Sequence, residues 1–220
     1  MLLRLALAWA TLVASTTAFA EGLVSSTYFP LRVGNWWAYE EQGDEGSTLS
    51  RETWSVMEYR GGEFHLRSLT KRFDALGHTG YRFEGHEYLR ASPDGVRKRY
   101  PAGKDRELDV LLVKEPPHDG ARWRDGQGSC EVEAQSRCRG PHGPLDDCLM
   151  IVCTLGEPAA TIVTSTYARG VGMVRQEVDV LQLLPTFEGP GELSPSNTRR
   201  DGHSLLRLTD YNVGRGRQRR

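Results

Sequence analysis

After residue 20 the sequence has no long apolar segment and no stretch with amphipathic helix periodicity. Its charge is nearly balanced, with 28 Lys and Arg against 29 Asp and Glu, so nothing directs it to a nucleic acid or another polyanion. Hydrophobic residues make up 38% of the 220 positions, an ordinary share for a chain that folds alone as one domain. A nucleic-acid partner is therefore not expected.

The common catalytic motifs are also absent. There is no G-x-S-x-G, no H-E-x-x-H and no phosphate-binding P-loop. Ser68 and Lys71 match S-x-x-K, but they lie in a strand-like run that places them on opposite faces. The sequence therefore predicts no catalytic residue and no cofactor. The alternative is a hydrolase whose His and its Asp, Glu or Ser partner converge only in three dimensions.

The six histidines are scattered, and most lie in or beside turns. His78 and His86 flank a strand-like run with Glu84 and Glu87 nearby, which would suit a surface metal site. Solvated turn histidines account for the same pattern, and no metal site is predicted.

Residues 1–20, MLLRLALAWATLVASTTAFA, have the form of a secretory signal peptide: Arg4, an apolar run and a small-residue ending at Ala18 to Ala20. Cleavage after Ala20 removes Arg4 and leaves 27 basic against 29 acidic residues, a net charge of about −2. We expect an exported protein, periplasmic or extracellular, with no stable membrane span after cleavage.

All four cysteines lie between Cys130 and Cys153, and export favours disulfides over metal binding or free thiols. Cys130 and Cys138 share one face of an alternating strand, about 26 Å apart at about 3.3 Å per residue. A disulfide needs Cα atoms within roughly 4.4–6.8 Å, so these two cannot pair. A free thiol of lowered pKa would point to disulfide exchange instead.

The turn-forming segment 139–144 lets the following apolar run fold back antiparallel to the first strand. This hairpin predicts disulfides joining Cys130 to Cys153 and Cys138 to Cys148. Because Cys148 and Cys153 have opposite parity along a strand, we also predict a β-bulge within 149–152.

Short alternating runs separated by Gly, Pro and Asp turns predict an all-β antiparallel meander that forms a curved sheet, half-barrel or sandwich. Residues 106–115 fit a strand about as well as a short helix. We expect one β-rich domain over residues 21–213, with a flexible loop at 186–202, and a basic disordered tail at 214–220.

One spacing occurs twice. Pro30, Gly34 and Trp37 form P-x-x-x-G-x-x-W, and Pro116, Gly120 and Trp123 repeat it. Each copy would be a turn that delivers Trp into a strand, which suggests an internal repeat, although three fixed positions also arise by chance.

The opening YFPLRVGNWWAYE, the later YARGVGMVRQE and the closing LLRLTDYN occur in this order along the chain. With them the chain resembles exported bacterial proteins that have a YFPL-x-x-G-N-x-W-x-Y opening and a Y-x-x-G-V-G-x-V hairpin, among them the pilus-associated TapB-like proteins. The resemblance implies an all-β envelope domain without an assigned activity. The paired cysteines and the 186–202 segment are not features of that pattern.

Aromatic residues offer the candidate ligand site, because rings supply a large contact area at low entropic cost. Packing in the core is the competing explanation. The sequence thus predicts a non-catalytic envelope module that binds a hydrophobic ligand or an envelope protein on a concave sheet face. The candidate binding residues are Trp36, Trp37, Tyr39, Trp54 and Trp123.

Overall fold

The computed structural model describes residues 26–74, 76–101, 107–125, 128–156, 160–187 and 193–214, and within them the chain forms β-strands and no helix. The predicted signal peptide and the end of the basic tail lie outside the described residues. The strands are β1 (Trp36–Gly43), β2 (Thr48–Arg60), β3 (Glu63–Phe73), β4 (Thr79–Ser92), β5 (Gly95–Pro101), β6 (Glu107–Lys114), β7 (Arg122–Asp125), β8 (Gly128–Gly140), β9 (Gly143–Leu155), β10 (Ala160–Ala168), β11 (Gly172–Phe187) and β12 (Leu193–Asn212).

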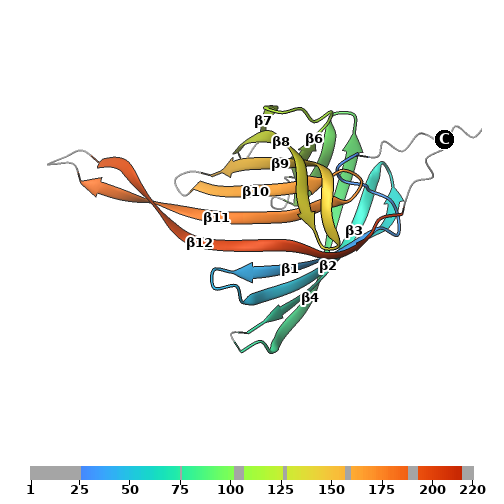
Figure 1. Cartoon of the computed structure of the whole chain (residues 1–220), viewed down its shortest axis with the longest axis horizontal. Helices are drawn as coiled ribbons and strands as arrows, with labels where there is room; N and C mark the ends of the chain where they lie inside the picture. The colour runs from blue at the N-terminus through green and yellow to red at the C-terminus, as the bar shows by residue number, and fades with distance from the viewer. Residues whose placement is uncertain are drawn as a thin grey trace, which may run out of the picture.

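All these strands form one antiparallel sheet in the order β6-β5-β4-β3-β2-β1-β12-β11-β10-β9-β8-β7. The first and last strands pair at its centre, and the two edge strands, β6 and β7, are consecutive in the chain. Figure 1 shows the sheet curling over while the β11–β12 hairpin projects away from it. The predicted antiparallel meander is confirmed as a curved, open sheet, and 107–114 is a strand.

The sheet consists of two meanders, β1–β6 and β7–β12, and each begins at one copy of P-x-x-x-G-x-x-W. Gly34 and Gly120 both have positive φ, 91° and 72°, which a glycine adopts without strain. The Gly34 amide donates to the Val56 carbonyl, and the Gly120 amide donates to the Val132 carbonyl. The backbone hydrogen bonds on either side of these two also match between the copies, so the repeated spacing corresponds to a repeated local structure.

A single sheet has no second layer to cover its apolar face, so this sheet buries that face by curling. Two side chains of β1 reach across the inside of the curl. Trp37 Nε1 donates to the Val171 carbonyl at 2.6 Å, and Tyr39 Oη donates to the Met173 carbonyl at 3.1 Å. Both side chains are at most 1% exposed, so the concave face at this end is the protein core.

The segment from Ser26 to Asn35, here called the N-terminal plug, closes one end of the curl. Tyr28, Phe29 and Leu31 are 1–3% exposed. The Phe29 ring lies 5.4 Å from the Trp37 ring and 6.2 Å from the Tyr167 ring. The YFPL opening is therefore a packing element that joins β1 to β10.

Polar contacts tie the plug to two further parts of the chain. Ser26 Oγ and the Thr27 amide donate to the Glu115 carboxylate, between β6 and β7. Tyr28 Oη donates to Asp147 Oδ1 at 2.5 Å, and this bond is the main reason that the pKa of Asp147 lies below its usual value. The plug thus connects both halves of the sheet.

Both predicted disulfides are present. Cys130 lies directly opposite Cys153, with Cα atoms 4.1 Å apart, whereas the Cys138–Cys148 bridge is diagonal, with Cα atoms 6.0 Å apart. The predicted bulge within 149–152 is wrong, because the β8–β9 register does not shift there. The alternation of side chains between the two faces is interrupted at Asp147, whose φ is 56°. The side chain of the following residue, Cys148, therefore points to the buried side.

Where the sequence predicts a flexible loop at 186–202, the structure continues β11 to Phe187 and starts β12 at Leu193. Residues 188–192 lie outside the described residues. The β11–β12 register shifts between Leu184 and Thr186, and Pro185 has no partner there. Proline lacks an amide donor, so its place at the shift leaves the regular pairing on either side intact. The alternating segment can therefore stay in strands despite its prolines.

Replacing Phe29 by Ala should lower the free energy of unfolding by about 3–5 kcal/mol, because it removes a buried ring from the contact between the plug, β1 and β10. Urea denaturation followed by tryptophan fluorescence would measure the change. Val33→Ala is the matched control, since Val33 lies in the same segment but is 52% exposed; its effect should stay within about 0.5 kcal/mol. Equal effects would contradict a structural role for the plug.

Candidate functional site

The concave face of β1–β4 carries two rows of side chains in direct register. Residues opposite one another in antiparallel strands share a face. Here they form the Trp54 row, Trp37, Trp54, Ser68 and Gly85, and the Glu52 row, Tyr39, Glu52, Thr70 and Phe83.

The Glu52 row leads from the core to the surface. Tyr39 is 1% exposed, Thr70 is buried and Phe83 is 48% exposed. Tyr81, two residues before Phe83 and therefore on the same face, is 56% exposed. The row thus ends in two accessible aromatic rings, where β4 extends beyond its pairing with β5.

Glu52 is the unusual member of this row. Its carboxylate accepts a hydrogen bond from Thr70 Oγ1 at 3.1 Å, and no cation among the described residues forms a salt bridge with it. Burial is the main reason that the pKa of Glu52 is raised; the nearby charge of Glu87 raises it further, and that of Lys98 lowers it. Glu87 itself pairs with Lys98 at 2.7 Å, so that cation already has a partner.

The Tyr39 hydroxyl borders the same carboxyl. Burial raises the pKa of Tyr39 well above its usual value, with smaller effects from Tyr167 and Glu52. Tyr39 therefore stays protonated and serves as a donor to the Met173 carbonyl. A half-buried carboxyl whose pKa is raised by partial loss of solvent is a recognised marker of a functional site.

The structure brings three of the five predicted binding residues together. Trp37 is fully buried, Tyr39 lies next to it in the core, and Trp54 packs on Tyr39 with ring centroids 5.0 Å apart. Trp36 alternates to the opposite face, and Trp123 lies on the far edge strand β7. Their role in ligand binding stays a prediction.

Glu52, Thr70 and Phe83 were not among the predicted binding residues. Glu52 precedes Trp54 by two residues in an alternating strand, so the sequence did indicate that both side chains share one face. It did not contain the register of β3 and β4, which brings Thr70 and Phe83 into the same row.

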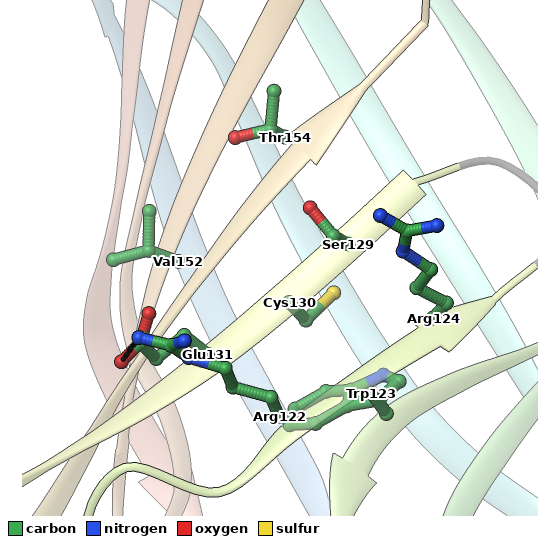
Figure 2. Close-up of a pocket in the computed structure, with 8 residues that line it drawn as sticks. All are labelled: Arg122, Trp123, Arg124, Ser129, Cys130, Glu131, Val152 and Thr154. Carbon is green, nitrogen blue, oxygen red and sulfur yellow. Dashed lines mark hydrogen bonds and ion pairs between the residues drawn. The ribbon is translucent and has the colours of Figure 1, made fainter.

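A pocket of about 530 Å³ lies at the edge strand β7 (Figure 2). Arg122 closes one side by pairing with Glu131 at 2.9 Å, and Trp123 contributes a ring whose buried Nε1 has no hydrogen-bond partner among the described residues. The pocket is lined by Arg122, Trp123, Arg124, Ser129, Cys130, Glu131, Val152 and Thr154.

Among the described histidines, one pair is in contact. His86 lies beside His65, with Nδ1 and Nε2 2.9 Å apart, and not beside His78. No group of three His, Cys, Asp or Glu side chains in the described ranges is placed to hold a metal ion.

Two histidines are hydrogen-bonded to an acid: His203 Nδ1 is 2.9 Å from Asp179 Oδ1, and His142 Nε2 is 3.2 Å from Asp210 Oδ1. No hydroxyl or thiol of the described residues is bonded to the other nitrogen of either ring, and the hydrolase alternative stays a prediction. All four cysteines are in disulfides, which leaves no free thiol to begin disulfide exchange.

The fold and the concave rows define a strongly curved, single-sheet β-protein, and the comparisons with known proteins concern that fold. No family model matches the sequence, and no curated protein matches it. Similar solved structures include a candidate lipoprotein from Parabacteroides distasonis, with 12% identity, a TM-score of 0.47, and coverage of 86% of this chain and 99% of that one. A candidate exported protein with a YmcC-like fold from Bacteroides fragilis has 14% identity, a TM-score of 0.46, and coverage of 85% and 99%.

A bilayer-spanning helix is not found in the part of the chain that the structure describes.

Replacing Glu52 by Gln should stabilise the protein at pH 8 and much less at pH 4. A raised folded-state pKa means that ionisation opposes folding; stability is highest below the unfolded pKa and falls as pH rises through the folded pKa. Gln keeps an acceptor for Thr70 but carries no charge. Thermal unfolding at both pH values would measure the effect, and a larger gain at pH 4 would contradict it.

Proposed function

We propose that this chain is a non-catalytic exported module that binds a hydrophobic ligand on the concave face of β1–β4, with a hydrogen-bond donor of the ligand directed at Glu52. The observation that carries the proposal is the Glu52 carboxyl, half-buried beside aromatic rings and in no salt bridge with another described residue. Burying a carboxyl in this way costs stability, so an arrangement that only served folding would favour an apolar residue.

The surroundings of Glu52 determine the chemistry of the ligand. Phe83 and Tyr81 present accessible rings at the outer end of the Glu52 row, while Tyr39 lies at its inner end with Trp54 packed on it. Aromatic walls with few polar groups suit an apolar body whose orientation is fixed by one donor. The carboxyl accepts hydrogen bonds when ionised, so an amine, amide or hydroxyl group is the donor that fits.

Export is supported by the secretory pattern of residues 1–20 and by both disulfides, since disulfides persist in oxidising compartments. The YFPL-type opening supports placing the chain with the exported bacterial proteins that it resembles. In this structure that opening supplies the N-terminal plug. The function is thus one of binding in the cell envelope, with periplasm or exterior as its location.

Fluorescence titration with N-phenyl-1-naphthylamine, an apolar probe with one N–H donor, tests the proposal. We expect saturable binding and quenching of tryptophan emission. Phe83→Ala should weaken the binding about tenfold, or about 1.4 kcal/mol, because it removes an accessible ring from the row. Glu52→Gln should weaken the binding at pH 8 by about threefold to tenfold, because a charged acceptor is lost.

Leu69→Ala is the matched control for Phe83→Ala. Leu69 precedes Thr70 on β3, is 43% exposed and faces the opposite side of the sheet. Its replacement should leave the dissociation constant of the probe unchanged. The proposal fails if the wild-type protein does not bind the probe, or if Leu69→Ala and Phe83→Ala weaken binding equally.

A further inference from the structure

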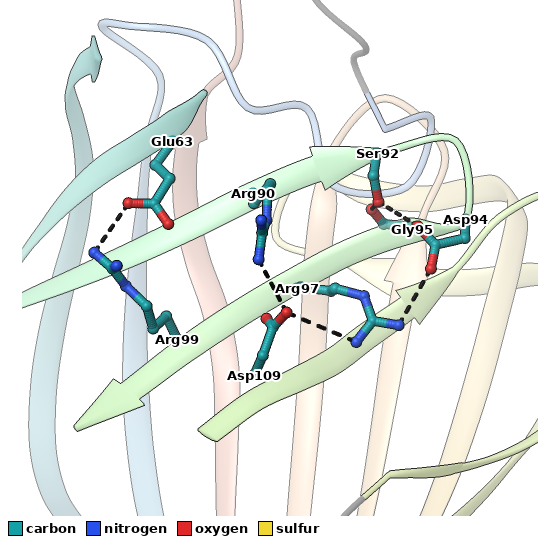
Figure 3. A network of polar contacts seen from close by, with 8 residues as sticks. All are labelled: Glu63, Arg90, Ser92, Asp94, Gly95, Arg97, Arg99 and Asp109. Atoms are coloured by element: carbon teal, nitrogen blue, oxygen red, sulfur yellow. Dashed lines mark hydrogen bonds and ion pairs between the residues drawn. The ribbon is translucent and has the colours of Figure 1, made fainter. Parts of the chain in front are cut away.

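β4 has an unpaired edge along more than half of its length. β3 pairs with it as far as Thr79, but β5 pairs only with Tyr88–Ser92. Figure 3 shows β5 diverging from β4 beyond the ion pairs that Arg90 and Arg97 make with Asp109. Residues 79–84 are all exposed, so the edge lies open to solvent.

The neighbouring turn determines which residues of β4 direct their backbone amides and carbonyls to this open edge. Ser92 and Gly95 close a two-residue turn, so their backbone groups face each other. Because these groups alternate along an antiparallel strand, those of Tyr88 also face β5. By the same alternation the amides and carbonyls of Gly80, Arg82, Glu84 and His86 point away from β3, towards the open edge, where none of the described strands pairs with them.

An open edge of this kind is a template for another strand. We propose that the β4 edge pairs with the β4 edge of a second copy of this chain, antiparallel and with Phe83 opposite the partner's Phe83. The twofold axis then passes between the two Phe83 residues. Arg82 lies opposite the partner's Glu84, and Glu84 lies opposite the partner's Arg82.

Charge selects this register over its neighbours. Centring the pair on Arg82 would oppose two guanidinium groups, and centring it on Glu84 would oppose two carboxylates. Like charges directly opposite each other destabilise a strand pair, whereas opposite charges stabilise it by about 0.2–1 kcal/mol per pair. The Phe83-centred register lies between the two and gives opposite charges on both sides of the axis.

The apolar contacts agree with the same register. Phe83 meets its copy, and Tyr81 lies opposite the partner's Gly85, which leaves space for the ring. These contacts are on the concave face, whereas Arg82 and Glu84 point to the convex face. Changing the two charges therefore tests the pairing without altering the Glu52 row. A strand pair of this length is a small interface, so a dissociation constant in the micromolar range is expected.

Charge reversal gives a direct test of the register by sedimentation velocity over a range of protein concentrations at low salt. The wild-type protein should change from monomer to dimer as its concentration rises. Arg82→Glu alone and Glu84→Arg alone should each weaken dimerisation at least tenfold. An equimolar mixture of the two variants should form a heterodimer, because each altered charge again meets an opposite one.

Arg137→Glu is the matched control for the loss of a positive charge. Arg137 is an exposed arginine on β8, away from the β4 edge, and its replacement should leave the dimer unchanged. Far-UV circular dichroism would verify that every variant is folded. A monomeric wild-type protein, a dimer unaffected by Arg82→Glu, or a mixture that stays monomeric would overturn the proposal.

Cross-linking gives an independent measurement. Phe83→Cys should form a covalent dimer on mild oxidation, because the two side chains face each other across the twofold axis. The native cysteines are all bridged and give no background. Leu69→Cys, which lies on β3 and faces the convex side, should not form this dimer. Equal cross-linking of both variants would refute the Phe83-centred register.

Discussion

The structure depends on one constraint: a single sheet without a second layer has to bury its own apolar face. It does so by curling, and the hydrogen bonds from Trp37 to Val171 and from Tyr39 to Met173 hold the curl across its inside. The N-terminal plug then fills one end, with Phe29 against Trp37 and Tyr167. The two hydrogen bonds and the contact of Phe29 with Tyr167 join segments more than a hundred residues apart in sequence, so this end of the curl is held by long-range interactions.

Internal repetition explains how one chain builds so wide a sheet. Each half begins with the same turn, in which Gly34 or Gly120 supplies the positive φ and a following Trp enters the first strand. The two copies then diverge. Trp37 is fully buried at the centre of the sheet, whereas Trp123 lies on the short edge strand β7, partly exposed beside a pocket. The same local sequence therefore has a core role in one half and a surface role in the other.

The features proposed to be functional lie where the sheet is least complete. Around Trp37 and Tyr39 the curl is closed, and side chains serve stability. Towards Phe83 β5 diverges from β4, so the concave row reaches solvent and the β4 edge has no partner among the described strands. The extended part of β4 thus carries both the proposed ligand surface on its inner face and the proposed pairing edge along its side. The half-buried carboxyl of Glu52 lies where the closed and open regions meet.

Strand identity and cysteine pairing could be predicted from the sequence, because they follow from local alternation and turn residues. The period-2 pattern around Cys130 and Cys138, with the turn after them, was enough to specify both disulfides, and the resulting hairpin is observed. Local pattern could not locate the parity change at Asp147, because a left-handed backbone conformation at a non-glycine residue depends on surrounding contacts. It also did not predict that β11 and β12 continue past Pro185 and Pro195, since the register shift exists only in the paired strands.

For the candidate site, the sequence by itself determined which residues are large and aromatic but not which of them face the same surface. Trp36 and Trp37 are neighbours in the chain and lie on opposite faces, and the partners of Trp54 come from strands whose register only the tertiary structure fixes. Glu52 became recognisable once the curl had buried it, because a carboxylate is unusual only in relation to the solvent and charges around it. Sequence thus determined the strands and the bridges, while long-range pairing decided the shape of the concave face and the edge left open.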